Sequence, residues 1–175
     1  MRIIAGRWRG HNIAAPPGEK TRPTTDRVRE AWMSVLQHDL PGARVLDLFA
    51  GSGALGLEAL SRGAAHVTFV ENGAGPLRAL QSNIAHLGAE AEVEVIRADA
   101  VRYAESLPAA AFDIALADPP YDGGGAARLL ARFAEAPFAQ ILCVEHRARE
   151  ALPPVPGAKT RRYGDTALTF ITARA

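Results

Sequence analysis

Short apolar stretches alternate with helical patterns between residues 44 and 146, and this alternation limits the fold more than any other feature of the chain. The stretches are RVLDLFA (44–50), HVTFVE (66–71), EVEVIRAD (92–99), FDIALADPP (112–120) and AQILCVEH (139–146). Nearly continuous apolar runs of this length are typical of strands that are covered on both faces. Such strands separated by helices predict an α/β protein with a parallel sheet between two layers of helices.

Further elements are predicted around this alternation. Before the first strand, one apolar stripe repeats at helical spacing and follows three N-cap candidates, Thr24, Thr25 and Asp26. The stripe consists of Val28, Ala31, Trp32, Val35 and Leu36. Residues 2–14 are predicted to form a β-hairpin, and residues 159–174 form two β segments around a turn at Gly164 and Asp165.

The length of 175 residues fits one domain. We divide it into an N-terminal extension, residues 1–23, and a catalytic core, residues 24–175. No apolar run reaches the roughly 18–20 residues of a membrane helix, and the first residues lack the apolar segment of a secretory signal. Cys143 is the only cysteine, which excludes an internal disulfide and a cysteine-based metal cluster. We therefore expect a cytoplasmic, metal-free chain without a membrane partner.

Charge is unevenly distributed, although the formal net charge is only +1. Residues 1–44 contain eight Lys and Arg against four Asp and Glu, and residues 126–175 have the same balance. Residues 45–125 contain four basic and eleven acidic residues. An acidic middle between basic ends favours a polyanionic partner that is held by the ends of the chain.

A glycine-rich loop follows the first strand. The segment DLFAGSGALG has the pattern G-x-G-x-x-G at Gly51, Gly53 and Gly56, and Glu71 ends the next strand 20 residues after Gly51. Glycines at these positions let the backbone approach a ligand, and a carboxylate at this spacing accepts hydrogen bonds from a ribose diol. The pattern by itself also fits a nicotinamide-binding protein.

Three carboxylates follow or end successive strands, and together they favour a different nucleotide. Asp47 lies just before the glycine loop, where it would face a cationic group more readily than a pyrophosphate. Glu71 and Asp99 lie at the ends of the second and third strands, and Asp99 can accept from an adenine amino group. Ligands of open α/β sheets bind at this edge. A ligand with a sulfonium, a ribose and an adenine satisfies all three, so the sequence predicts S-adenosylmethionine. The alternative for each acid alone is a helix cap or a solvated loop residue.

The fourth strand ends in ADPPY, which predicts a rigid acceptor site. Two adjacent prolines stop the strand and fix its backbone. The Asp118 carboxylate and the Pro119 carbonyl can accept hydrogen bonds from both hydrogens of an exocyclic amine, and Tyr121 offers a face on which a base can stack. The fourth strand is expected beside the first, so both loops face one crevice.

These motifs resemble a known family. DLFAGSGALGLEALSRGA followed by ADPPY is similar to the Rossmann-like class I S-adenosylmethionine-dependent methyltransferases that act on exocyclic amines. RIIAGRWRG, RPTTDRVREAWMSVL and YGDT resemble one branch, the RsmD-type bacterial 16S rRNA guanine-N2 methyltransferases. The resemblance covers nearly the whole chain. It implies a seven-stranded, mostly parallel sheet with one antiparallel strand, helices on both faces and a small N-terminal β-hairpin.

The resemblance also implies roles for particular residues. The substrate would be a guanine of 16S rRNA, of the guanine-966 type, in free rRNA or in a partly assembled 30S subunit, and the protein would act as a monomer. Catalytic contacts are expected from Asp118, Pro119 and Tyr121. Cofactor contacts are expected from Asp47, Phe49, Gly51, Gly53, Glu71, Asp99 and Ala100. RNA contacts are expected from Arg7, Arg9, Arg22 and Arg27, with Arg29 as a further candidate on the first helix.

Three other residues have structural interpretations, and other functions stay open. We expect Cys143 in the core, His146 at an edge and Asn83 in a structural role. The open alternatives are a methyltransferase for DNA adenine or a protein side chain, a nicotinamide-dependent oxidoreductase, and an RNA-binding protein without activity.

Overall fold

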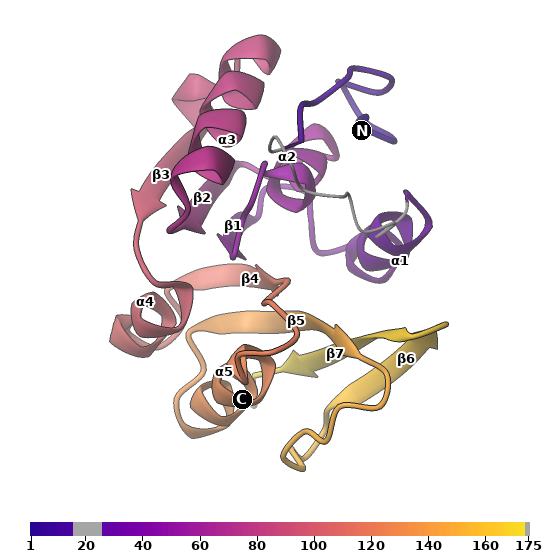
Figure 1. Ribbon diagram of the computed structural model, residues 1–175, viewed down its shortest axis with the longest axis vertical. Helices are drawn as coiled ribbons and strands as arrows, with labels where there is room; N and C mark the ends of the chain where they lie inside the picture. Colours follow the sequence, from indigo (N-terminus) through magenta and orange to yellow (C-terminus); the bar gives the residue numbers. More distant parts are fainter. Residues whose placement is uncertain (16–25, 174–175) are drawn as a thin grey trace.

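A computed structural model describes residues 1–15 and 26–173, and these form a seven-stranded sheet with helices on both faces (Figure 1). The strands are β1 (Arg44–Leu48), β2 (His66–Glu71), β3 (Val93–Arg97), β4 (Phe112–Ala117), β5 (Ala139–Arg147), β6 (Lys159–Tyr163) and β7 (Thr166–Thr172). Their order across the sheet is β3-β2-β1-β4-β5-β7-β6. β7 runs antiparallel to both neighbours, and the other pairs are parallel. The predicted mostly parallel sheet with one antiparallel strand is confirmed.

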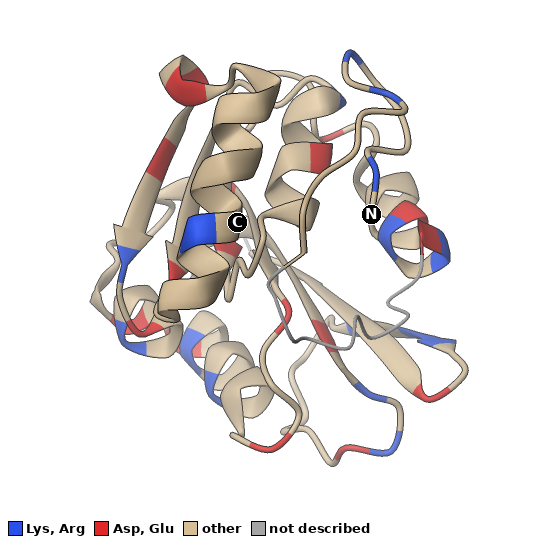
Figure 2. Cartoon of the chain, turned by 45° about the horizontal axis from the view of Figure 1, so that its top comes forward, with Lys and Arg blue, Asp and Glu red and all other residues tan. Residues whose placement is uncertain are grey.

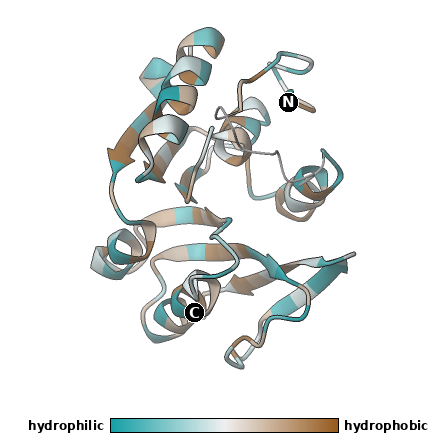
Figure 3. Cartoon of the chain, viewed as in Figure 1, coloured by the Kyte–Doolittle hydropathy of each residue, from teal (hydrophilic) through white to brown (hydrophobic). Residues whose placement is uncertain are grey.

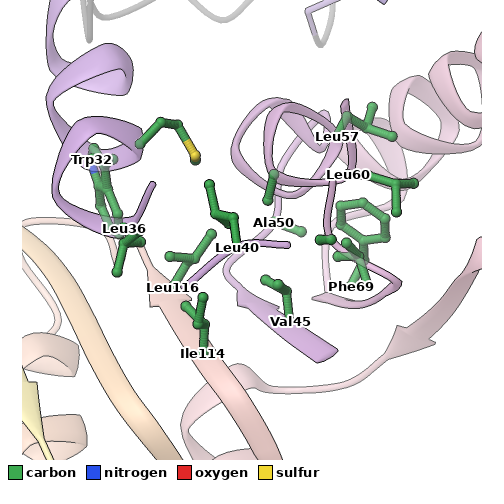
Figure 4. Packing of buried hydrophobic residues seen from close by; sticks show 14 of the residues in the cluster. Trp32, Leu36, Leu40, Val45, Ala50, Leu57, Leu60, Phe69, Ile114 and Leu116 are labelled. Atoms are coloured by element: carbon green, nitrogen blue, oxygen red, sulfur yellow. The ribbon is translucent and has the colours of Figure 1, made fainter. Parts of the chain in front are cut away.

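The helices divide the interior into two cores. One face is covered by α1 (Asp26–Leu36), α2 (Ala54–Ser61) and α3 (Ala74–Leu87), and the other by α4 (Ala100–Ser106) and α5 (Gly125–Glu135). The first core includes Trp32, Leu60 and Phe69 (Figure 4), and the second includes Leu129 and Phe133. Apolar residues colour the central strands in Figure 3, as expected for strands buried on both faces.

The functional edge of the sheet follows from the register of β1. Leu48 at the end of β1 pairs with Val70 on β2 and with Ala117 on β4. The chain leaves β1 toward β2 and returns from β3 to β4 on the other side of β1, so the strand order reverses there. The carboxyl ends of these strands therefore meet at one edge, where open α/β sheets bind their ligands.

Residues 1–15 fold back on themselves over α2, and the predicted hairpin is present as a short antiparallel pairing without regular strands. Its ladder is reduced to one antiparallel bridge, between Arg2 and Asn12. Around this bridge, three N–H groups bond across the hairpin: Ile3 to the His11 carbonyl at 2.9 Å, Gly10 to the Ile3 carbonyl at 2.9 Å and Ile13 to the Met1 carbonyl at 2.8 Å. Other backbone N–H groups bond to α2 instead, which limits the ladder. Ile4 N–H lies 3.0 Å from both oxygens of the buried Glu58 carboxylate, and Trp8 N–H donates to the Ser61 hydroxyl at 3.1 Å. We call residues 1–15 the N-terminal loop.

Several boundaries differ from the sequence prediction. The first strand ends at Leu48 because Phe49 adopts a positive φ of 59°, which breaks the extended backbone. β4 ends at Ala117, one residue before Asp118 and the two prolines. The short helix α4 was not predicted. It begins after Asp99, whose carboxylate accepts from Arg102 N–H at 2.9 Å, as expected of an N-cap.

Three other sequence expectations concern the start of α1, the turn of the C-terminal hairpin and the membrane. The N-cap candidates Thr24 and Thr25 lie outside the described residues, and α1 begins at Asp26. The turn of the C-terminal hairpin is confirmed, since Gly164 has a φ of 64° between β6 and β7. Within residues 1–15 and 26–173, every helix is too short or too polar to cross a membrane.

The seating of the N-terminal loop on α2 yields a matched pair of variants. Gly6 and Gly10 have nearly the same φ, 85° and 84°. A Cβ on Gly6 would lie 1.9 Å from the Ser61 carbonyl oxygen, whereas one on Gly10 would meet nothing within 4 Å. Alanine costs about 1–2 kcal/mol at both positions for the left-handed backbone. We expect Gly6→Ala to lower the free energy of unfolding by about a further 1–3 kcal/mol, through overpacking. Urea denaturation of both variants measures this difference, and equal losses would contradict the seating.

Candidate active site

Three alternate residues of the glycine loop have a left-handed backbone conformation. Phe49, Gly51 and Gly53 have φ values of 59°, 57° and 88°, and Gly53 is the N-cap of α2. Non-glycine residues seldom adopt this conformation, so Phe49 is a strained position next to the predicted cofactor site. The backbone of this loop turns sharply between β1 and α2, at the carboxyl end of the sheet.

Glu71 fixes this loop through backbone donors. One carboxylate oxygen accepts from Gly51 N–H at 2.7 Å, and the other accepts from Gly73 N–H at 2.9 Å and Asn72 N–H at 3.1 Å. The carboxylate thus joins the loop after β1 to the loop after β2. Each carboxylate oxygen has more than one lone pair, so this role is compatible with the predicted bond to a ribose.

Asp47 lies beneath the loop and is almost fully buried, with 1% of its surface exposed. Its Oδ2 accepts from Gly56 N–H at 2.9 Å, in the first turn of α2. A Cβ on Gly56 would lie 2.4 Å from the ring of Phe69 and 2.9 Å from the same Oδ2, so only glycine allows this approach. The structure therefore gives Asp47 a position inside the wall of the site.

The electrostatics of Asp47 connect the two predicted halves of the site. Burial raises the pKa of the Asp47 carboxyl well above its ordinary value, and the charges of Asp118 and Glu71 raise it further. The bond from Gly56 acts in the opposite direction. Asp118 comes from the loop after β4 and Glu71 from the end of β2, so carboxylates from three strand ends act on one another. An excess of negative charge in a partly buried site favours a cationic ligand.

Packing contacts join the same two loops. Gly125 begins α5, and a Cβ there would lie 3.0 Å from the Pro119 side chain and 3.4 Å from the ring tip of Phe49. Phe49 and Pro119 thus both lie close to the same side of one glycine. The predicted cofactor loop and the DPPY segment, residues 118–121, are neighbours at a single edge of the sheet.

Tyr121 is held by the C-terminal hairpin. Its hydroxyl lies 3.2 Å from the Thr166 hydroxyl, at the start of β7. The Arg147 guanidinium, at the end of β5, lies 4.9 Å from the centre of the Tyr121 ring, a distance typical of cation–π contact. Arg147 also lies 3.8 Å from the exposed carboxylate of Asp122. We call Thr166 and Arg147 the Tyr121 clamp.

The contacts of Thr166 and Arg147 with Tyr121 were not predicted from the sequence. Thr166 belongs to YGDT, which entered the analysis only as a family motif. The two residues are brought together by the register of β5 and β7, in which Arg147 and Thr166 are direct partners. Pairing between strands that are distant in sequence cannot be deduced from the local pattern.

The remaining predicted cofactor residues, Asp99 and Ala100, lie where β3 passes into α4. Asp99 is exposed and uses Oδ1 as the cap of α4, so its predicted bond to an adenine amine would have to share this carboxylate. Ala100 is buried in the second core, which leaves only its backbone for a ligand. Both contacts stay predictions.

The predicted RNA-binding arginines fall into different environments. Arg7 forms an ion pair with Glu92 and stacks on the Trp8 ring at 4.0 Å, while Arg9 and Arg27 are exposed. Arg22 lies outside the described residues. Arg29 is buried, contrary to its expected exposure to phosphate. It donates to the Arg2 carbonyl at 2.7 Å and to Asp26 at 3.0 Å, and burial lowers its pKa. Arg29 therefore joins α1 to the N-terminal loop.

The structure shows the surroundings of the three residues for which structural roles were expected. Cys143 is fully buried, and Asn83 bonds to Ala14 and to the Ser52 carbonyl, so both are confirmed as structural. The expectation of an edge position for His146 is wrong. Its side chain is buried and lies 2.6 Å from the Thr169 hydroxyl. Across the described part of the chain, His, Cys, Asp and Glu form no cluster that could hold a metal ion.

Comparison with known proteins places the chain in a family. The model of the family described as Conserved hypothetical protein 95 matches residues 1–172. The chain belongs to this family. It is 37% identical over 159 residues to "Ribosomal RNA small subunit methyltransferase D" of Escherichia coli (strain K12), with 89% of this chain and 79% of the relative covered. The resemblance to the RsmD type is confirmed.

Two further matches extend over almost the whole chain. "Putative rRNA methyltransferase YlbH" of Bacillus subtilis (strain 168) is 35% identical over 183 residues, with 99% of this chain and 100% of the relative covered. The solved structure "Putative methyltransferase yhhF" from Escherichia coli is 32% identical and aligns with a TM-score of 0.83, with 100% of this chain and 98% of that chain covered. The Rossmann-like methyltransferase fold is therefore shared over its full extent.

Burial of Asp47 predicts a pH dependence of stability. Because its pKa is raised in the folded chain, the folded state binds this proton more tightly than the unfolded chain. The contribution of Asp47 is complete below about pH 4, the ordinary range of an Asp, and is lost as pH rises through the raised pKa. Asp47→Asn keeps an oxygen for Gly56 and cannot ionise.

We expect the free energy of unfolding of Asp47→Asn, minus that of the parent, to increase with pH by up to about 1.4 kcal/mol per pH unit. Urea denaturation of both proteins without ligand, from about pH 4 upward, measures this difference. A difference that stays constant with pH would show that Asp47 is not perturbed.

The hydrogen bond in the Tyr121 clamp predicts coupling between its two partners. Tyr121→Phe and Thr166→Val each remove one hydroxyl. The double variant should therefore be more stable than the sum of the single effects predicts, by about 0.5–1.5 kcal/mol. Thr172→Val, an exposed position on the same strand, is the control and should be additive with Tyr121→Phe. Additivity for Thr166 as well would exclude the bond.

Proposed function

We propose that this chain transfers a methyl group from S-adenosylmethionine to the exocyclic N2 amine of a guanine in 16S rRNA, of the guanine-966 type. The observation that carries the proposal is the juxtaposition of the two loops. Phe49 of the glycine loop and Pro119 of the DPPY segment both approach Gly125, and the charges of Asp118 and Glu71 act on the same buried carboxyl, that of Asp47. A methyl donor and a flat acceptor can therefore meet at this edge.

The residues of the glycine loop fit the methyl donor. S-adenosylmethionine, when bound, supplies an activated methyl on a positively charged sulfur. Its sulfonium and ammonium groups match the excess of carboxylate charge around Asp47, and its ribose hydroxyls match Glu71 at the end of β2. A Cβ on Gly51 would meet nothing within 4 Å, so this glycine leaves space for a ligand, whereas Gly53 is buried and lets the loop pack against Leu80 of α3. We assign the adenine to Asp99 and to the backbone of Ala100, where β3 passes into α4.

The DPPY segment supplies the groups that orient the acceptor amine. The nitrogen lone pair of such an amine is delocalised into the ring, so the amine is a weak nucleophile. If the Asp118 carboxylate and the Pro119 carbonyl accept its two hydrogens, the lone pair turns toward the methyl group. Asp118 can also stabilise the developing positive charge. Alignment of this kind supplies about 7–11 kcal/mol of a barrier.

The substrate class follows from the relatives and the site together. The relative from Escherichia coli is named a ribosomal RNA small subunit methyltransferase, and the one from Bacillus subtilis carries an rRNA methyltransferase name. We extend this substrate to the present chain and place the reaction in the cytoplasm, with a monomeric enzyme. DNA adenine and protein side chains are the competing acceptors, because the same site chemistry suits any amine held against Tyr121.

The decisive experiment offers the acceptors separately. Purified protein and labelled S-adenosylmethionine are incubated with deproteinised 16S rRNA, with 30S subunits, with duplex DNA and with ribosomal proteins. The rRNA is taken from cells that lack this protein, so that its target is unmodified. We expect label in the rRNA, on N2 of one guanine by mass spectrometry of nucleosides. Labelling of DNA or protein alone would overturn the proposal.

Asp118→Asn tests the role of the DPPY carboxylate. We expect the methylation rate to fall by about 10²-fold or more, because the orienting and charge-stabilising carboxylate is lost. Binding of S-adenosylhomocysteine, measured by calorimetry, should persist. Asp113→Asn is the matched control, because Asp113 is the second residue of β4, at the opposite end of that strand from Asp118. Equal rates for both variants would remove Asp118 from the mechanism.

A further inference from the structure

The register of the C-terminal hairpin separates its basic residues onto two faces. Directly opposite residues of an antiparallel pair place their side chains on the same face of the sheet. Lys159 pairs with Phe170 and Arg161 with Leu168, and both β7 partners belong to or pack against the first core. Lys159 and Arg161 therefore lie on the face that carries α1, which we call the α1 side.

The neighbouring positions of β6 lie on the other face. Thr160 pairs with Thr169 and bonds to its hydroxyl at 2.8 Å. Both threonines line a cavity of about 590 Å³ together with Leu130 of α5. Side chains alternate along a strand, so Arg162 also faces this α5 side. The hairpin thus has adjacent arginines, Arg161 and Arg162, that point to opposite faces.

The α1 side of the hairpin is continuous with the Tyr121 clamp. Tyr163 pairs with Thr166, and Thr166 pairs with Arg147 on β5, so these three residues share the face of Arg161. Thr166 bonds to Tyr121, and Arg147 stacks on its ring. Residues two apart on one face of a strand are about 7 Å from each other, so Arg161 and Lys159 continue outward from the clamp in two steps.

The cations on this face are exposed, unlike several others in the molecule. The side chains of Lys159 and Arg161 on β6 are exposed, and Figure 2 shows the Lys and Arg positions of the hairpin in blue. Among the described residues, neither enters an ion pair, whereas Arg7, Arg62 and Arg128 each have an acidic partner. The acidic residue of the hairpin, Asp165, lies in its turn.

We propose that the α1 side of the β6–β7 hairpin binds the ribose-phosphate backbone of the acceptor RNA next to the methylated base. The proposal rests on the proposed function, because it takes the Tyr121 site as the place of the base. Lys159 and Arg161 neutralise phosphates of the strand that leaves this site, and Arg147 forms the border between backbone and base. RNA is thereby bound by the C-terminal hairpin as well as by the N-terminal region.

A different role for these cations makes a different prediction. Charged residues on edge strands prevent two sheets from pairing edge to edge, and for that role the face does not matter. Backbone binding instead requires the α1 side. Arg161 and Arg162 are adjacent, exposed and equal in charge, so the pair distinguishes the two roles.

The experiment measures the affinity for an rRNA fragment with an unmodified target, as a function of salt concentration. Each lost phosphate contact reduces the slope of log K against log salt by about 0.7 for a single strand and 0.9 for a duplex. We expect this reduction for Arg161→Gln, about twice the reduction for the Lys159→Gln, Arg161→Gln double variant, and no change for Arg162→Gln. In methylation assays the double variant should raise KM at unchanged kcat.

Controls separate the possible failures. Thermal unfolding and binding of S-adenosylhomocysteine should be the same for all variants and the parent. An unchanged slope for the double variant, or equal changes for Arg161→Gln and Arg162→Gln, overturns the proposed RNA surface while normal methylation by the parent leaves the proposed function intact. Absence of methylation by the parent on every RNA overturns the proposed function itself.

Discussion

The parallel pairing of β1 with β4 is the constraint on which the site depends. Leu48 and Ala117 are register partners, so the glycine loop and the DPPY segment leave the sheet side by side. The two loops are separated by about 70 residues in the chain, and β2, β3 and their helices occupy the interval on the far side of β1. A slip of one residue in this register would turn the side chains of one strand to the other face and separate the loops.

The site combines rigid backbone with concentrated negative charge. Glu71 uses both oxygens to bind three backbone N–H groups, and Asp47 binds one more from the buried interior. These contacts replace some of the hydration that the carboxylates lose on folding. The charges of Asp47, Glu71 and Asp118 still repel one another, so a cation entering the site removes a cost that the empty site carries. The carboxylates that hold the loops in place are thus the same groups whose charge favours a cationic donor.

Much of the fold could be predicted from the sequence because its strands are buried on both faces. Near-continuous apolar runs identified β1 to β5, and the glycine loop and DPPY identified the functional edge. α4 was missed because Asp99 was assigned to a ligand, although the same residue caps the helix. The N-terminal hairpin is less regular than predicted because the N–H groups of Ile4 and Trp8 bind side chains of α2, which a local pattern does not reveal. Contacts between distant segments, such as Tyr121 with Thr166, require the tertiary structure.

The basic residues at the two ends of the chain differ in the contacts they already make, and this affects where RNA can bind. Near the N-terminus, Arg29 of α1 donates to the Arg2 carbonyl in a buried contact, and Arg7 of the N-terminal loop pairs with Glu92 and stacks on the Trp8 ring. The C-terminal hairpin instead ends the sheet with an edge strand, so the side chains of β6 have no further strand beside them. A cation that is already paired must break that pair to bind a phosphate, whereas an exposed cation exchanges only water and counterions. The exposed charges of β6 are therefore more available for RNA than Arg7 and Arg29 are.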